Sequence, residues 1–214
     1  MRGRLDNGDR SGLSGRVARQ GDGAGGEGPG GEAGFPAGAG IVLGLGLGGF
    51  VDGILFHQIL QWHHMASSAG MATGTVGGLR AQVRLDGLFH AATWGLVLVG
   101  LVMLWRAVRG RAARGTHAPW RAGQMGGALL AGWGLFNLAE GVVNHHLLGL
   151  HHVNETVPRD QWIWWDGGFL VAGALLVAAG LALMRDQRSM RASSVQASAP
   201  PSSIGTSQGP EEDR

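Results

Sequence analysis

Ionisable side chains are concentrated in two stretches of this chain that are otherwise apolar. The first is DGILFHQILQWHHM, from Asp52 to Met65, and the second is EGVVNHHLLGLHH, from Glu140 to His152. Histidines and carboxylates are common ligands of transition metals, and both also carry protons. In hydrocarbon each such group is costly unless another group satisfies it. The two stretches therefore predict a polar cluster with a specific role inside a membrane.

The second stretch repeats the first at an offset of 88 residues. GLGLGGFVDGILFHQILQWHH, at 44–64, aligns without a gap with GWGLFNLAEGVVNHHLLGLHH, at 132–152, so that Asp52 meets Glu140. A weaker repeat relates DGLF at Asp86 to DGGF at Asp166. The pattern predicts two copies of a helix pair in the same orientation, related by a pseudo-twofold axis along the membrane normal.

Three histidines are expected to lie at the same depth below the outer ends of their helices. Counted from the outer ends of the apolar segments, His57, His90 and His145 each lie six residues inside, or about 9 Å at 1.5 Å per residue. Three imidazoles from separate helices suit a metal ion with an open fourth position, so we predict these three as the ligands. Polar neighbours are expected to orient the ligands or relay protons: Asp52, Glu140, Asp86, Asp166, Gln61 and Asn144. The other histidines of the two stretches are expected at the rim: His63, His64, His146, His151 and His152.

The bound group stays open between copper, zinc, iron and haem. The chain has no Cys, which excludes thiolate ligands, whereas Met65 and Met71 offer thioethers that suit copper. His57 and His145 could instead be axial ligands of haem, as in membrane four-helix cytochromes. Two other interpretations remain: a hydrogen-bond network that only holds helices together, and a small proton or metal-cation transporter that uses Asp52 and Glu140. The residues leave open whether the protein is an enzyme.

Four apolar segments are long enough to cross a bilayer at about 20 residues each. They occupy residues 38–62, 85–106, 123–149 and 162–184. Polar, Gly-, Ser- and Pro-rich tails are expected to be disordered at 1–34 and 187–214, on either side of a membrane domain at 35–186. The predicted fold class is all-α: an integral membrane four-helix bundle made of two parallel-repeated helix pairs.

Arginines are unevenly distributed between the two ends of these segments, and this predicts the orientation. Excess Lys and Arg marks the cytoplasmic side, so both termini are expected in the cytoplasm and the histidine-rich ends outside. The arginines also lack the clustering on one helix face that nucleic-acid binding requires. One side has Arg19, Arg106, Arg109, Arg111, Arg114, Arg121, Arg185, Arg188 and Arg191, and the other has Arg80, Arg84 and Arg159.

Four blocks of the sequence resemble a known family. GFVDGILFHQILQWHHM, LDGLFHAATW, GWGLFNLAEGVVNHHLLGLHHV and WWDGGF look like the signature of bacterial four-helix membrane proteins that are catalogued as a domain of unknown function. The resemblance covers about residues 38–186. It implies an integral protein of the bacterial cytoplasmic (inner) membrane and supplies no activity. Besides the lipid bilayer, the expected partners are another membrane metalloprotein or a second copy of the chain.

Overall fold

The chain folds into long helices that contain most of the residues whose placement can be described. The computed structural model describes residues 34–70, 74–116 and 119–198, with side chains as far as Arg185. Within these ranges the elements are helical and no strand occurs. Four helical stretches there are long and apolar enough to cross a membrane: Ala37–Ile59, Val76–Ala113, Ala122–Leu147 and Arg159–Arg185. The all-α fold class and the four membrane-length helices are therefore confirmed.

Two of the four helices change their winding before they end. Helix α1 (Ala37–Val51) continues as the π-helix η1 (Asp52–Ile59), and α3 (Ala122–Glu140) continues as the π-helix η2 (Gly141–Leu147). Helix α2 (Val76–Ala113) is α-helical throughout, and the short 3₁₀ helix η3 (Arg159–Gln161) leads into α4 (Trp162–Ser198). Both π-helices fall in the polar stretches. Such departures from α-helical geometry are frequent at functional sites.

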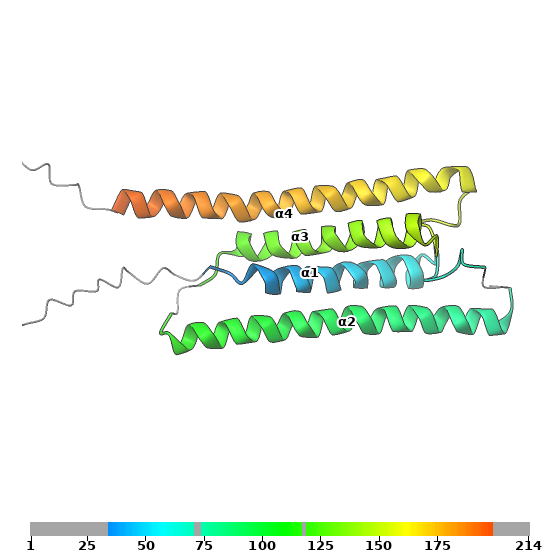
Figure 1. The fold of residues 1–214 in the computed structure, drawn as a ribbon, viewed down its shortest axis with the longest axis horizontal. Coiled ribbons are helices and arrows are strands. Elements are labelled where there is room, and N and C mark those ends of the chain that lie inside the picture. The colour runs from blue at the N-terminus through cyan, green and yellow to red at the C-terminus, as the bar shows by residue number, and fades with distance from the viewer. Residues whose placement is uncertain (1–33, 71–73, 117–118, 199–214) are drawn as a thin grey trace, which may run out of the picture. The chain divides into compact units, whose positions relative to one another are not determined.

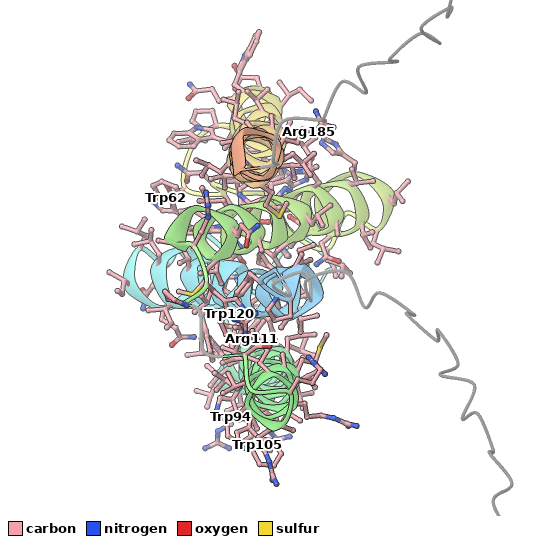
Figure 2. All side chains as sticks on the ribbon, turned by 90° about the vertical axis from the view of Figure 1, so that its left-hand side faces the viewer. Trp62, Trp94, Trp105, Arg111, Trp120 and Arg185 are labelled. Atoms are coloured by element: carbon pink, nitrogen blue, oxygen red, sulfur yellow. The ribbon has the colours of Figure 1, made fainter. Side chains whose placement is uncertain are left out.

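The helices lie side by side in a row, with α1 and α3 in the middle (Figures 1 and 2). Helix α2 packs on α1 and α4 packs on α3, and within the described parts of the chain α2 and α4 do not contact each other. Successive helices run in opposite directions, so η1 and η2 reach the same end of the row (Figure 1). The loops at 60–70 and 148–158 follow them there. We call this end the histidine end.

Glycines bring the backbones of α1 and α3 into direct contact. A Cβ on Gly44 would collide with the carbonyl oxygen of Leu129, and one on Gly132 would collide with the carbonyl oxygen of Ile41. Nearer the N-terminus of α1, a Cβ on Gly40 would lie 2.7 Å from a ring carbon of Phe35. Small residues at such spacings let helices in a membrane approach closely. Backbone packing therefore closes the interface between α1 and α3 in the region between the polar stretches and the end of the row opposite the histidine end.

Two boundaries differ from the sequence-based expectation. Helix α2 begins at Val76 instead of residue 85, because the Thr75 side chain accepts a hydrogen bond from Gly78 N at 3.0 Å and caps the helix. Buried Gln82 then fastens this first part to the preceding loop, since its side chain donates to Ala66 O at 3.0 Å and accepts from Ala66 N at 3.2 Å. At the other end, the α4 helix continues to Ser198, beyond the expected boundary at residue 186, and the expected disorder of the tails stays a prediction. The remaining tails, 1–33 and 199–214, lie outside the described residues.

The end of the row opposite the histidine end is rich in arginine and tryptophan. Figure 2 faces this end, with Trp105, Arg111, Trp120 and Arg185 labelled. The Arg111 guanidinium lies 5.3 Å from the Trp120 ring centre, and the ring of Trp120 also packs edge-on against Phe35 at 5.3 Å. Aromatic and basic side chains of this kind are typical of a membrane interface.

Candidate metal centre

The π-helices place a carboxylate beside a histidine five residues later. Asp52 Oδ2 lies 3.2 Å from His57 Nε2, and Glu140 Oε2 lies 3.0 Å from His145 Nε2. In an α-helix, five residues advance by about 500°, which would leave the two side chains about 140° apart. A π-helix closes its turns between residues i and i+5, which brings such a pair onto one face. The local winding therefore creates both pairs.

A left-handed residue then turns each chain segment back over its π-helix. Gln61 has φ 50° and Gly149 has φ 57°, and these two positions are equivalent at the offset of 88. The turn brings His63 and His151 back into the interior, where their rings stack with centroids 4.4 Å apart and planes 5° apart. Both are buried, with 3% and 0% of their surfaces exposed, so neither lies at the rim where sequence analysis expected it.

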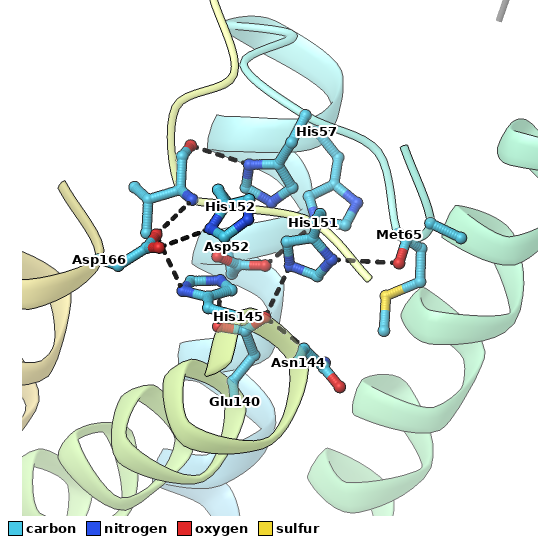
Figure 3. A network of polar contacts seen from close by, with 12 residues as sticks. Asp52, His57, Met65, Glu140, Asn144, His145, His151, His152 and Asp166 are labelled. Atoms are coloured by element: carbon cyan, nitrogen blue, oxygen red, sulfur yellow. Dashed lines mark hydrogen bonds and ion pairs between the residues drawn. The ribbon is translucent and has the colours of Figure 1, made fainter. Parts of the chain in front are cut away.

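Each returning loop is held by the other half of the protein. His63 Nδ1 donates to the carbonyl oxygen of Val153 at 2.9 Å, and His151 Nδ1 donates to the carbonyl oxygen of Met65 at 3.1 Å. Met65 and Val153 are themselves equivalent at the offset of 88. Figure 3 shows His151 between Glu140 and the carbonyl of Met65. The two halves thus exchange equivalent hydrogen bonds across the centre.

Asp86, from the DGLF motif of α2, anchors the first half. Its Oδ1 accepts from His57 Nδ1 at 3.0 Å and from Met65 N at 2.8 Å, while its Oδ2 accepts from His64 Nδ1 at 2.7 Å. The ring of Phe89, three residues later, stacks on His57 with centroids 5.4 Å apart. The motif therefore fixes the position of His57 from two sides.

Asp166, from the DGGF motif of α4, does the same in the second half. Its Oδ2 accepts from His152 Nδ1 at 2.6 Å, its Oδ1 accepts from Val153 N at 2.9 Å, and Oδ1 lies 3.3 Å from His145 Nδ1. The ring of Phe169 lies 5.4 Å from that of His145. The contacts of one half therefore recur in the other, although an origin by duplication stays a prediction.

The anchored Nδ1 atoms determine what the opposite nitrogens can do. A carbonyl oxygen only accepts, so Nδ1 of His63 carries a proton and Nε2 of the neutral ring carries a free lone pair. Burial holds the pKa of His63 well below its usual range, which keeps the ring neutral. Its Nε2 is buried and has no hydrogen-bond partner among the described residues. Such a nitrogen is available as a metal ligand.

Three other Nε2 atoms face carboxylate oxygens. The distances are 3.2 Å from His57 to Asp52, 3.0 Å from His145 to Glu140, and 2.7 Å from His151 to Glu140. A neutral ring that donates through Nδ1 presents a lone pair to an anionic acceptor here, so each contact requires a proton or a cation. Ligand atoms about 2.1 Å from one metal ion lie about 3 to 3.4 Å apart in octahedral or tetrahedral geometry. The first two contacts fit that range.

Two overlapping sets of donor atoms are close enough to hold an ion. One set is His57, His63 and His151, and the other is Glu140, His145 and His151, each with one donor atom per residue and all of these within 4.8 Å of one another. Several atoms around them are buried and lack an aligned hydrogen-bond partner, including those that form the short His–carboxylate contacts. They are Asp52 Oδ2, His57 Nε2, His63 Nε2, Glu140 Oε2, and both ring nitrogens of His145.

His90, which the sequence analysis predicted as the third ligand, lies apart from both sets. Its Nδ1 donates to the carbonyl oxygen of Asp86 at 2.8 Å in its own helix, and its Nε2 packs against Gly53, where a Cβ would lie 2.6 Å away. The second half has the apolar Leu170 at the position equivalent to His90. The structure therefore brings His57 and His145 together with His63 and His151, and it leaves His90 outside.

The other predicted site residues are also placed by the structure. Asn144 is half-buried and its Nδ2 donates to Glu140 Oε1 at 3.4 Å, whereas Gln61 is exposed and serves the chain reversal through its backbone. His64 and His152 are half-buried near the surface and His146 is exposed. Met65 contributes its backbone, and Met71 lies outside the described residues.

An open groove of about 500 Å³ lies beside His152 at the histidine end. Ser67, Glu155, Arg159 and Trp162 are among the residues that line it, and the ring of His152 packs on that of Trp162 at 4.5 Å. Because His152 also contacts Asp166, which lies beside His145, polar side chains connect the groove with the buried centre.

Comparison with known proteins defines the class to which this fold and polar centre belong. A family model described as "Predicted membrane protein (DUF2243)" matches residues 39–187. The chain therefore belongs to this family of predicted membrane proteins, whose function is unknown. No curated protein and no solved structure shows significant similarity to the chain.

Proposed function

We propose that this membrane protein binds a transition metal through the buried histidines and carboxylates at its histidine end. The observation that carries the proposal is the orientation of His57, His63, His145 and His151. Nδ1 of His57, His63 and His151 donates to a fixed acceptor, and Nδ1 of His145 lies 3.3 Å from Asp166 Oδ1. The Nε2 atoms of His57, His145 and His151 face carboxylates. This is the arrangement by which proteins orient histidine ligands, with an outer acceptor that selects the tautomer.

A purely structural role accounts less well for the same atoms. A network that only holds helices together gains stability when its buried polar atoms are paired, and unpaired ones cost free energy. Here His63 Nε2 has no hydrogen-bond partner among the residues that the structure describes, and the contacts of His57 and His145 with Asp52 and Glu140 are short but poorly aligned as hydrogen bonds. A bound cation would satisfy these atoms together.

We favour a metal ion over haem. A haem with histidines on both faces needs a slot between them, but the rings of His63 and His151 stack directly at 4.4 Å and the ring of His57 lies 4.4 Å from that of His63. In a bundle that binds haem between its helices, the helices surround the haem. In this protein the helices form a row instead, with α2 and α4 at its opposite ends.

We also favour binding over transport. A transporter that uses Asp52 and Glu140 needs a route to the other side of the membrane, and the helices beyond these residues approach through Gly44 and Gly132 with their backbones in contact. The groove beside His152 offers access from the histidine end. A centre that takes up a metal and returns it on one side of the membrane accounts for this asymmetry.

The proposed setting is the bacterial cytoplasmic membrane, with both termini in the cytoplasm and the histidine end outside. Arginines at the opposite end, among them Arg109, Arg111 and Arg185, support this orientation. Duplication of an ancestral helix pair accounts for the equivalent contacts of the two halves. Metal exchange would take place at the groove, with another membrane metalloprotein or a second copy of the chain as the partner.

Metal analysis of the purified full-length protein tests the proposal. We expect bound zinc, iron or copper by mass spectrometry and no haem absorption band. The double variant His57→Ala/His145→Ala should lose the metal, whereas His146→Ala, which changes an exposed neighbour, should keep it. A wild-type protein that takes up no metal under any loading condition would refute metal binding, and a haem spectrum would replace the metal ion with haem.

A further inference from the structure

Each half of the protein contributes one carboxylate and two histidines to the centre, at equivalent positions in the sequence. The first half supplies Asp52, His57 and His63, and the second supplies Glu140, His145 and His151 at the equivalent positions. In both sets a carboxylate and a histidine come from a π-helix and the second histidine comes from the loop that turns back over it. Two histidines and one carboxylate with open positions form a common ligand set for non-haem iron(II).

The unpaired atoms are divided between the two halves. Within the described part of the chain, no aligned partner is found for Asp52 Oδ2, His57 Nε2 and His63 Nε2 in the first half, or for Glu140 Oε2 and His145 Nε2 in the second. The two close donor groups overlap only in His151, whose Nε2 lies 2.7 Å from Glu140. An ion placed in one half would therefore leave buried atoms of the other half unsatisfied.

The charge of the centre also favours two ions over one. Four buried carboxylates, those of Asp52, Asp86, Glu140 and Asp166, are at most 6% exposed. The ion pairs found for them within the described part of the chain join them to histidines. One divalent ion offsets two of the four negative charges, whereas two divalent ions offset all four and leave the histidines neutral, as metal ligation requires. Uncompensated charge is costly at membrane depth.

We infer that the centre holds two divalent metal ions, one in each half. Asp52, His57 and His63 hold the first, and Glu140, His145 and His151 hold the second. This inference rests on the proposed metal-binding function and specifies it further. Imidazole and carboxylate donors without thiolate favour iron(II), zinc or manganese(II) over copper(I). Asp86 and Asp166 act as outer acceptors that orient His57 and His145.

Stoichiometry tests the inference separately from metal binding itself. The full-length protein, loaded with manganese(II) without oxygen and freed of excess metal, should contain two equivalents per chain. A value of one would overturn the two-ion centre and leave the proposed function standing, and a value of zero after loading with manganese(II), iron(II) and zinc in turn would overturn both. His57→Ala and His145→Ala should each keep about one equivalent, and His146→Ala should keep two. A single variant that keeps two, or one that is folded and keeps none, contradicts one ion per half.

Electron paramagnetic resonance provides a measurement that needs no variant. Two manganese(II) ions in adjacent ligand sets interact magnetically, so the fully loaded wild-type protein should give a broadened, coupled spectrum. The six-line spectrum of an isolated ion at full loading would overturn the inference even if the histidine variants fail to fold.

Discussion

His57 lies directly beside Asp52, with 3.2 Å between Nε2 and Oδ2, although five residues of helix separate them. Glu140 and His145 stand in the same relation at 3.0 Å. The π-helical winding of Asp52–Ile59 and Gly141–Leu147 produces both contacts. The centre therefore depends on helix register as well as on residue identity, and a change of helix length can disrupt it without removing a ligand.

Insertion and deletion near Ile54 should have unequal effects. Inserting one Ala after Ile54 separates Asp52 and His57 by six residues, which aligns them in neither an α-helix nor a π-helix, so we expect the first half to lose its metal. Deleting Ile54 leaves a spacing of four, which an α-helix places on one face, so this variant should retain more metal. The metal content of each variant, measured by mass spectrometry, tests whether the deletion variant retains more metal than the insertion variant. Ile54 is 47% exposed, and Ile54→Ala is the control that preserves length. Equal loss in the insertion and deletion variants would show that register is not the cause.

Asp86→Asn should weaken metal binding without removing a ligand. Asp86 accepts from both His57 and His64, and the neutral amide loses the charge that orients and polarises the His57 ring. Loss of such an outer partner typically costs about 10- to 100-fold in metal affinity. Competition with a chelator of known affinity measures the change. Asp160→Asn, at an exposed position in η3, is the matched control, and an unchanged affinity for Asp86→Asn would remove Asp86 from the centre.

Gly44→Ala should destabilise the protein, whereas Gly95→Ala should not. The new methyl group at Gly44 meets the Leu129 carbonyl and the backbone of Gly132, so α1 and α3 must separate, at a cost of about 1 to 3 kcal/mol in the free energy of unfolding. A methyl group at Gly95 meets nothing within 4 Å and improves helix propensity by up to about 1 kcal/mol. Thermal unfolding in one detergent compares the two. Equal melting temperatures would contradict the close packing of α1 and α3.

Reporter fusions should find the loop between α2 and α3 in the cytoplasm. A reporter that is active only outside the cytoplasm, fused after Arg114, should be silent, and the same reporter fused after Gly70 should be active. Arg114 follows the end of α2, and Gly70 lies in the loop at the histidine end. The opposite pattern would invert the membrane orientation and place the groove beside His152 in the cytoplasm.

Hydrophobic length and the distribution of polar residues were enough to predict four membrane-length helices and the membership of His57 and His145 in one cluster. The helix register around them was not predictable in this way, because π-helices have no strong composition signal and α-helical geometry separates Asp52 from His57. Depth counting then selected His90, whose side chain instead donates to the carbonyl oxygen of Asp86 and packs against Gly53. One signal was present: a carboxylate followed five residues later by a histidine occurs in both stretches.

The loop turns also escaped sequence analysis. Gln61 adopts a left-handed conformation that is uncommon outside glycine, so nothing in its own stretch indicates a reversal. Its equivalent, Gly149, is the residue type expected there. Comparison of the two stretches at this position would have suggested that the chain turns back after each helix and that His63 and His151 return to the interior.

The exchange of hydrogen bonds between the halves has a consequence for biogenesis. When the first helix pair enters the membrane during synthesis, His63 has no acceptor, because Val153 lies in a part of the chain that is made later. His151, by contrast, donates to the carbonyl of Met65, which has already been synthesised when the second helix pair enters the membrane. Insertion of the second pair therefore completes the first, and a ribosome-bound chain that ends before Val153 should remain open to proteases and to membrane quality control.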